Sequence, residues 1–148
     1  MPPSAASAQA AAAPPALAPG DSVAPFDAEG IDGRTRRIDF PKGGDTVLLF
    51  FLSGCPACHR MLPLWNQAYA RRPKGLNVVG VLMDREPPGF FMATEIAFPV
   101  VRSPGGEFNR ALKLNRVPLT LRVAPGGRVT DAAAGPIDAL RLGEIFRP

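Results

Sequence analysis

The stretch of sequence that decides the fold runs from residue 47 to residue 59 and reads Val47-Leu48-Leu49-Phe50-Phe51-Leu52-Ser53-Gly54-Cys55-Pro56-Ala57-Cys58-His59. Its first six residues are continuously apolar, with Gly43-Gly44-Asp45 before them and Ser53-Gly54 after them. This length and these flanks predict a strand covered on both faces, as at the centre of an α/β sheet. Apolar side chains then recur at three- and four-residue spacing up to Tyr69, which predicts a helix that starts at the cysteines.

Predicted strands and helices alternate along the rest of the chain. Strands are predicted at residues 24–26, 34–40, 76–83, 100–101, 119–123 and 128–131, the first two joined by a turn at residues 29–33. Helices are predicted from Pro87 to just before Pro99 and over residues 107–114 and 137–146. This order predicts an α/β fold of three layers, with a central mixed sheet, helices on both faces and an N-terminal hairpin.

The first twenty residues, Met1 to Gly20, differ from the rest of the 148-residue chain. They are rich in alanine and proline, carry no charged side chain and offer only Leu17 as a bulky apolar group. Ordering such a segment has an entropy cost that burial does not offset, so we expect residues 1–20 to form a flexible tether and residues 21–148 one domain. The segment lacks the basic and apolar regions of an intact signal peptide, and we expect an export signal or membrane anchor to precede it in the precursor.

The composition argues against two classes of protein. No apolar run approaches the ~20 residues that a membrane-spanning helix needs. The net charge is +4, from 17 basic and 13 acidic side chains, but the basic residues are scattered. One tryptophan and one tyrosine provide no ladder of aromatic rings on which bases stack, so we expect no nucleic-acid partner.

Cys55 and Cys58 are the only cysteines, and their position between a predicted strand and a predicted helix indicates their chemistry. At a helix N-terminus, unpaired backbone N–H groups and the helix dipole favour an anion, here the thiolate of Cys55. The thiolate is the nucleophile in thiol–disulfide exchange, and a thiolate that leaves easily makes exchange rapid. A structural disulfide across so short a loop contributes only about 2 kcal/mol, so the residues favour a redox-active pair.

Other interpretations of the same residues remain open. Cys55-Pro56-Ala57-Cys58-His59 matches the C-x-x-C-H attachment pattern of c-type haem, with His59 as one axial ligand and Met61, Met83 or Met92 as the other. Apolar strands on both sides of the motif argue against haem, which needs a chain that wraps it. Two cysteines and one histidine also leave a zinc ligand set incomplete. Without a haem, we expect His59 to be a partly exposed residue in the first turn of the helix. Its cationic form would then help to stabilise the thiolate of Cys55.

Beside the cysteines, several motifs resemble the thioredoxin superfamily over about residues 23–146. They are the strand–CxxC–helix of residues 47–71, Pro63 five residues after Cys58, Phe98-Pro99-Val100-Val101, and Val117-Pro118-Leu119-Thr120 followed by Pro125-Gly126-Gly127-Arg128-Val129. The chain is most similar to the TlpA/ResA/CcmG-like branch of periplasmic, membrane-tethered proteins, and around Cys55 also to MauD-like redoxins. The resemblance implies a thioredoxin-like fold and a thiol–disulfide oxidoreductase that reduces disulfides, often in cytochrome c maturation.

By this resemblance, Cys55 is the exposed nucleophile and Cys58 the buried resolving thiol. Pro118 is expected to be cis and stacked against the cysteines, with the backbone of Val117 binding an extended substrate segment by β-augmentation. The remaining substrate-binding residues are expected to be Gly54, Pro56 and Ala57. The implied partners are protein thiols and disulfides, in a substrate protein and in an upstream redox protein that is soluble or in the membrane. We expect a monomer outside the cytoplasm, in the periplasm or its equivalent, tethered only through the preceding anchor and needing no cofactor or metal.

Three positions depart from the family pattern. Gly54 stands where the family usually has tryptophan, Leu49 where thioredoxins place a buried aspartate, and Met61 where TlpA-like proteins often carry glutamate. Those acids help to move the proton of the buried cysteine, so the pattern leaves its base unidentified, with Asp84 and Glu95 as candidates. A c-type haem electron carrier and a non-catalytic thioredoxin-fold module that binds a metal or a partner remain the alternative functions.

Overall fold

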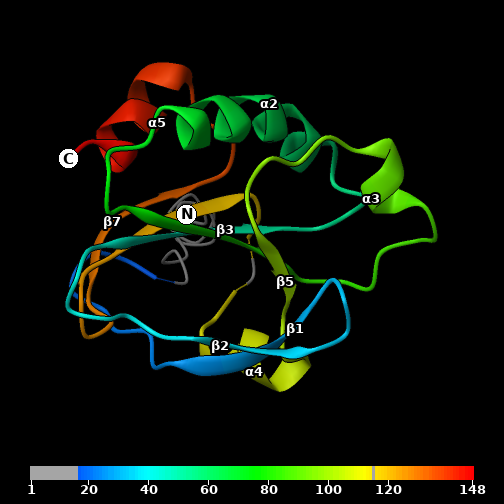
Figure 1. Ribbon diagram of the computed structural model, residues 1–148, viewed down its shortest axis with the longest axis horizontal. Coiled ribbons are helices and arrows are strands. Elements are labelled where there is room, and N and C mark those ends of the chain that lie inside the picture. Colours follow the sequence, from blue (N-terminus) through cyan, green and yellow to red (C-terminus); the bar gives the residue numbers. More distant parts are fainter. Residues whose placement is uncertain (1–16, 115) are drawn as a thin grey trace, which may run out of the picture.

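The computed structural model describes residues 17–114 and 116–148. In this part of the chain, seven strands form one mixed sheet in the order β2-β1-β5-β4-β3-β6-β7 (Figure 1). The strands are β1 (Phe26–Gly30), β2 (Thr35–Ile38), β3 (Thr46–Phe51), β4 (Asn77–Leu82), β5 (Val100–Arg102), β6 (Leu119–Val123) and β7 (Val129–Ala134). The helices of the described residues are α2 (Pro56–Ala70), α3 (Phe90–Ala93), α4 (Gly106–Ala111) and α5 (Ala139–Phe146).

The middle of the sheet is β3, which pairs with β4 in parallel and with β6 in antiparallel orientation. Residues 47–51 of this strand are all 0% exposed, because each face carries its own apolar cluster. Leu49 and Phe51 belong to the cluster beneath α2 and α5, whereas Leu48 and Phe50 belong to the cluster on the opposite face. The predicted central strand is therefore confirmed, and the cysteines follow directly from its end.

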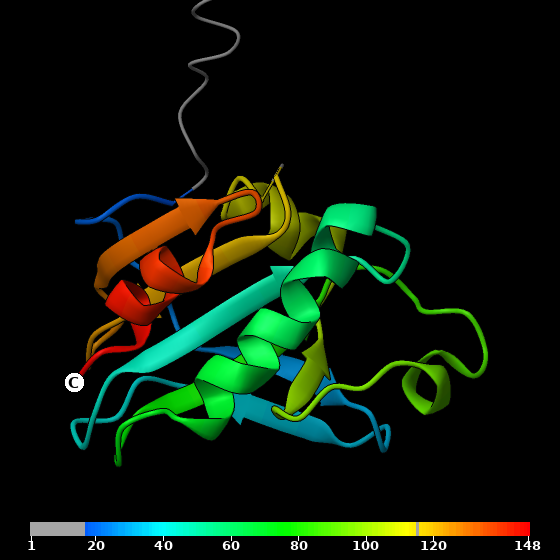
Figure 2. The same ribbon diagram turned by 90° about the horizontal axis from the view of Figure 1, so that it is seen from above.

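Helices cover both faces of the sheet, which confirms the predicted three-layer α/β fold (Figures 1 and 2). α2 and α5 lie on one face, where Trp65 and Ile145 join the cluster that includes Leu49 of β3. α4 lies on the other face, and the ring of its Phe108 is 4.6 Å from that of Phe26 in β1. The N-terminal hairpin extends the same sheet, since β1 pairs antiparallel with both β2 and β5. Among the described helices, none has the length and apolar character to cross a bilayer.

The helix predicted from Pro87 to just before Pro99 is confirmed only over Phe90–Ala93 and is wrong before and after these residues. α3 has only four residues, and Thr94 after it is extended. The side-chain amide of Asn66 in α2 accepts the N–H of Ala97 at 2.8 Å and donates to the carbonyl of Glu95 at 3.0 Å. These bonds hold the chain extended and offer its backbone groups an alternative to a helical ladder.

The folded part of the chain begins earlier than residue 21. Leu17 is 4% exposed and packs in the same apolar cluster as Val23. Gly20 donates its N–H to the carbonyl of Val129 at 2.9 Å, which ties this segment to β7. Residues 17–20, which were predicted to belong to the tether, therefore pack on the domain, because Leu17 finds an apolar site formed by residues distant in sequence. Residues 1–16 of the predicted tether lie outside the described residues.

A buried hydrogen bond ties α2 to β6: the indole N–H of Trp65 donates to Oγ1 of Thr120 at 3.1 Å. Thr120→Val keeps the shape of the side chain but leaves a buried N–H without an acceptor, so we expect the free energy of unfolding to fall by about 1–3 kcal/mol. Thr130→Val, at an exposed position of β7, is the matched control and should change it by less than about 0.5 kcal/mol. Chemical denaturation measures both variants, and equal losses would contradict a specific role for the Trp65–Thr120 bond.

Candidate active site

Cys55 occupies the N-cap of α2. The chain reaches this helix through a short loop that leaves the end of β3 (Figure 2). The backbone of Cys55 is extended, with φ −87° and ψ 115°, and its Sγ accepts the backbone N–H of Cys58 at 3.1 Å. A side-chain acceptor at this position satisfies one of the unpaired N–H groups at a helix start. Pro56 occupies the first turn, where its missing N–H has no cost. The sulfur of Cys55 therefore lies where a helix favours negative charge.

The two cysteines have different surroundings. Cys55 is half-buried, Cys58 is 1% exposed, and both thiols are free. Burial raises the pKa of Cys58 from 9.0 to about 12, with further increases from the hydrogen bond and charge of Cys55 and from the charge of Asp84. A backbone hydrogen bond from Leu52 acts in the opposite direction, since it lowers that pKa. The pair thus combines an accessible sulfur at a helix start with a buried, protonated sulfur three residues later.

The segment before β6 lies at the same edge of the sheet as the cysteines. Leu119 pairs with Phe50, so the residues before β6 adjoin the residues after β3. The Val117–Pro118 peptide bond is cis, as the resemblance implies, and Pro118 is buried. Val117 is half-buried and packs against the apolar cluster that contains Cys58. The fold therefore gathers both cysteines and this cis-proline segment at one site.

The residues expected to surround Cys55 differ in exposure. Gly54 and Pro56 are exposed, Ala57 is half-buried, and the preceding Leu52 is 36% exposed. A Cβ added to Gly54 would meet no heavy atom within 4 Å. Because no bulky side chain stands at this position, one side of the Cys55 sulfur is open to an approaching chain.

The ring of His59 is bonded to the loop in front of the cysteines. Its Nε2 lies 2.6 Å from the carbonyl oxygen of Ser53. A carbonyl only accepts, so Nε2 carries the proton and donates. The edge of the ring also packs on Phe90, at 6.1 Å between centroids. This placement leaves Nε2 unavailable to a haem iron, and the burial of Cys58 leaves its sulfur poorly placed for a bond to a haem edge.

The two family positions that lack an acid are buried and apolar. Leu49 is 0% exposed within β3. Met61 is 1% exposed, and its Sδ accepts the backbone N–H of Ile137 at 3.4 Å, which links α2 to the segment before α5. Of the two candidate substitutes, Glu95 is exposed, whereas the carboxylate of Asp84 reaches the loop before the cysteines.

Sequence reasoning missed Ser53, which donates two hydrogen bonds to the carboxylate of Asp84. Its backbone N–H donates to Oδ1 of Asp84 at 2.9 Å and its hydroxyl donates to Oδ2 at 2.6 Å. The available signal was positional: Ser53 follows β3, Asp84 follows β4, and the carboxyl ends of neighbouring parallel strands meet at one edge.

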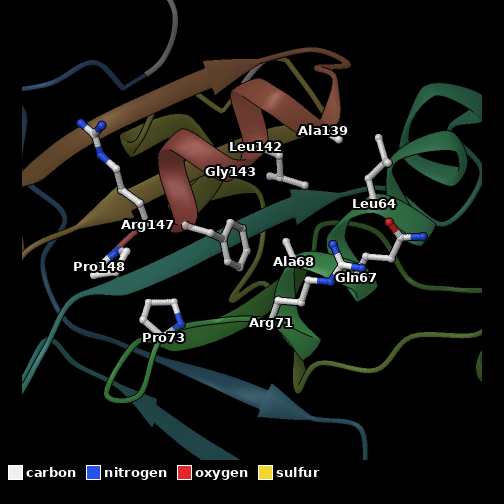
Figure 3. A pocket seen from close by; sticks show the side chains of 11 residues that line it. Leu64, Gln67, Ala68, Arg71, Pro73, Ala139, Leu142, Gly143, Arg147 and Pro148 are labelled. Atoms are coloured by element: carbon white, nitrogen blue, oxygen red, sulfur yellow. The ribbon is translucent and has the colours of Figure 1, made fainter.

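A separate cavity of about 430 Å³ lies between the second half of α2 and α5 (Figure 3). Its walls are formed by Leu64, Gln67, Ala68, Arg71, Pro73, Ala139, Leu142, Gly143, Phe146, Arg147 and Pro148. This lining holds no cysteine, histidine or acidic side chain, whereas the cysteines lie at the opposite end of α2. The cavity is therefore distinct from the redox site. Over residues 17–114 and 116–148, no cluster of three or more His, Cys, Asp or Glu side chains could hold a metal ion.

Comparisons with known proteins agree with this geometry. A family model described as Redoxin matches residues 18–139, a range that includes both cysteines and Pro118. Sporulation thiol-disulfide oxidoreductase A of Bacillus subtilis (strain 168) is 27% identical over 110 residues, which cover 70% of this chain and 67% of that protein. The crystal structure of StoA from Bacillus subtilis is similar with a TM-score of 0.72 and 26% identity, covering 86% of this chain and 100% of that chain. A thiol:disulfide interchange protein DsbE from Chlorobium tepidum also has a TM-score of 0.72 and 26% identity, covering 84% of this chain and 91% of that chain.

The different surroundings of the two thiols predict different rates of alkylation. In brief pulses of limiting iodoacetamide at neutral pH, we expect Cys55 to take the label and Cys58 to stay unlabelled. A rise in pKa from 9.0 to about 12 lowers the thiolate fraction of Cys58 roughly a thousandfold, and burial blocks the reagent as well. Peptide mass spectrometry measures each site, with the guanidinium-unfolded chain as the control in which both sites react alike. Equal labelling in the folded protein would show that Cys58 is not protected.

Proposed function

The chain belongs to the redoxin family of the thioredoxin superfamily and is a thiol–disulfide oxidoreductase, and from this premise we propose that Cys55 and Cys58 are its catalytic pair. One observation carries the proposal: the Sγ of Cys55 caps α2 and accepts the N–H of the buried Cys58, at the edge of the sheet where the cis peptide bond at Pro118 precedes β6. A nucleophile, a resolving group and a substrate-binding segment are the parts that dithiol exchange requires.

In the first proposed step, the thiolate of Cys55 attacks one sulfur of a disulfide in the partner protein. A bond forms between Cys55 Sγ and that sulfur, the partner's disulfide breaks, and its second sulfur leaves as a thiolate. The position of Cys55 at the helix start supports this role, because the charge that must exist before attack is favoured there. The product is a mixed disulfide between the two proteins.

In the second step, Cys58 loses its proton and attacks Cys55 Sγ. The Cys55–Cys58 disulfide forms, the bond to the partner breaks, and the partner sulfur leaves and takes up a proton. Two electrons have then passed from the dithiol to the partner, and an upstream thiol protein must restore the dithiol. The three-residue separation and the 3.1 Å contact between Cys58 N and Cys55 Sγ support such an intramolecular attack.

We further propose that Val117 and Pro118 bind the partner next to the reacting sulfur. Val117 is half-buried at the edge where β3 ends, so its backbone is suited to pair with an extended segment of the substrate. Gly54, Pro56 and Ala57 form the remaining wall around Cys55, and the open space beside Gly54 admits a bulky residue of the partner.

The surroundings of Cys58 support a reducing rather than an oxidising role. Strongly oxidising dithiols owe their potential to a stabilised reduced form. Burial, followed by the hydrogen bond and charge of Cys55 and by the charge of Asp84, instead raises the pKa of Cys58 to about 12, so its thiolate gains no such support. We therefore propose that the protein reduces disulfides in other proteins. We also propose that it acts as a monomer, needs no cofactor and works in the maturation of cytochrome c or of another exported protein.

We also propose that the protein works outside the cytoplasm, in the periplasm or its equivalent, held near the membrane by an anchor in the precursor. Structural disulfides form and persist in that compartment, so substrates of a disulfide reductant are found there. Its partners would be the disulfide-bonded protein that it reduces and the redox protein that returns electrons to it.

Single-cysteine variants test the catalytic assignment. We expect Cys55→Ser to lower the reduction of insulin disulfides by about 10²-fold or more, because the attacking sulfur is lost. Cys58→Ser keeps the attack but removes the resolving thiol, so it should accumulate a mixed disulfide with a disulfide-containing peptide, visible on a non-reducing gel. The double variant is the control and should form no adduct. An inactive wild-type protein, or one with a haem Soret band, would overturn the proposed function.

A further inference from the structure

Asp84 and Ser53 meet because of the register between two parallel strands. Phe51 of β3 is paired with Leu82 of β4, and Ser53 and Asp84 each follow two residues later. Both oxygens of the Asp84 carboxylate are engaged, one by the N–H of Ser53 at 2.9 Å and the other by its hydroxyl at 2.6 Å. Hydrogen bonds to an ionised acceptor are among the stronger ones in proteins. The loop that leaves β3 is thus fixed by a residue 31 positions away in sequence.

The loop fixed in this way, residues 52–54, contacts both cysteines. The carbonyl of Leu52 accepts the N–H of Cys55 at 3.4 Å. A backbone hydrogen bond from Leu52 lowers the pKa of Cys58. The carbonyl of Ser53 accepts from His59 Nε2, so the loop is held from α2 as well. A displacement of Ser53 would therefore change the backbone around both sulfurs.

The charge of Asp84 also acts on the buried thiol. A negative charge near Cys58 opposes ionisation of the thiol, and it adds to the effect of burial and of Cys55 on that pKa. On α2, the ring of His59 is turned to Ser53. The neighbouring basic residues, Arg85 after Asp84 and Arg116 before the cis peptide, are exposed.

We propose that Asp84 is the positioning residue of this redox pair: through Ser53 it fixes the loop of residues 52–54 against both sulfurs, and its charge slows the attack of Cys58 on Cys55 Sγ. Unlike the acids that the family carries at the positions of Leu49 and Met61, Asp84 acts from the end of β4 and is bonded to Ser53 rather than placed to take the proton of Cys58. It does not touch the substrate. The inference rests on the proposed redox role of Cys55 and Cys58.

The test follows the two releases of thionitrobenzoate when the reduced protein reacts with Ellman's reagent in a stopped-flow experiment. The first release accompanies formation of the mixed disulfide on Cys55, and the second accompanies attack of Cys58 on Cys55 Sγ. Asp84→Asn keeps the size of the side chain but removes its charge. Its amide oxygen can still accept the N–H of Ser53, and its NH2 can donate to the Ser53 hydroxyl, which then accepts instead of donating. For each unit by which the pKa of Cys58 falls, the fraction of Cys58 present as thiolate rises tenfold, whereas the nucleophilicity of that thiolate falls about threefold. We therefore expect the second release to become about threefold faster between about pH 6 and pH 9.

An increase in rate is a result that loss of a purely structural contact does not give. Glu95→Gln is the matched control, because it removes the same charge from an exposed position in the same β4–β5 connection, and it should leave the second release unchanged. Ser53→Ala removes one of the two hydrogen bonds to Asp84 but keeps the charge of Asp84. The loop then holds the backbone of Leu52 less firmly, so its hydrogen bond lowers the pKa of Cys58 less. The second release should therefore become slower. This variant also tests the proposal if Asp84→Asn does not fold.

The outcomes separate this inference from the proposed function. Absence of a second release in the wild-type protein would overturn the role of the cysteine pair itself. If both releases occur but Asp84→Asn leaves the second at the wild-type rate, or Glu95→Gln accelerates it equally, Asp84 is not the positioning residue. If Ser53→Ala behaves as wild type, the anchoring half of the proposal is wrong.

Discussion

Five consecutive residues of β3, from Val47 to Phe51, are buried on both faces of the sheet, and their burial determines where the chain can next become polar. Within such a strand, all backbone N–H and C=O groups are used by the two neighbouring strands. Backbone groups become available to other partners only where the strand ends, at the edge of the sheet. That edge is where Ser53, Cys55 and the first turn of α2 follow. The site is therefore a direct consequence of how the central strand is packed. Trp65, which is 0% exposed, fixes α2 over the same strand and donates to Thr120 of β6.

The chemistry of the two cysteines differs because they lie on opposite sides of the start of α2. Cys55 precedes the helix and faces unpaired backbone donors, whereas Cys58 lies one turn inside and faces the apolar cluster. A single short motif thus places one sulfur where a thiolate is favoured and the other where a thiol is favoured. The asymmetry needs no difference in residue type. Leu49 and Met61 leave this side of Cys58 without an acid, and the carboxylate nearest to the redox loop comes instead from Asp84 at the end of β4.

The parts of the fold that could be predicted from sequence are those with local causes. The apolar run at 47–52, the spacing of Met61, Trp65 and Ala68, and the Pro-Gly-Gly turn at 125–127 each specify an element through neighbours in the chain. The incorrect predictions have distant causes. The segment after α3 is extended because Asn66 binds its backbone groups, and Leu17 is ordered because a cluster of distant apolar residues receives it. Neither partner can be found within a short window of sequence.

The sequence by itself determined the two cysteines, their place between a buried strand and a helix, and the proline that precedes β6. These are fixed by residue type and short spacing, which a chain displays before it folds. Only the tertiary structure decided that the Val117–Pro118 bond is cis, that His59 is bonded to Ser53, and that Asp84 reaches the redox loop. Those features depend on strand register and on contacts between segments up to 31 residues apart, and such contacts come into existence only when the sheet has formed.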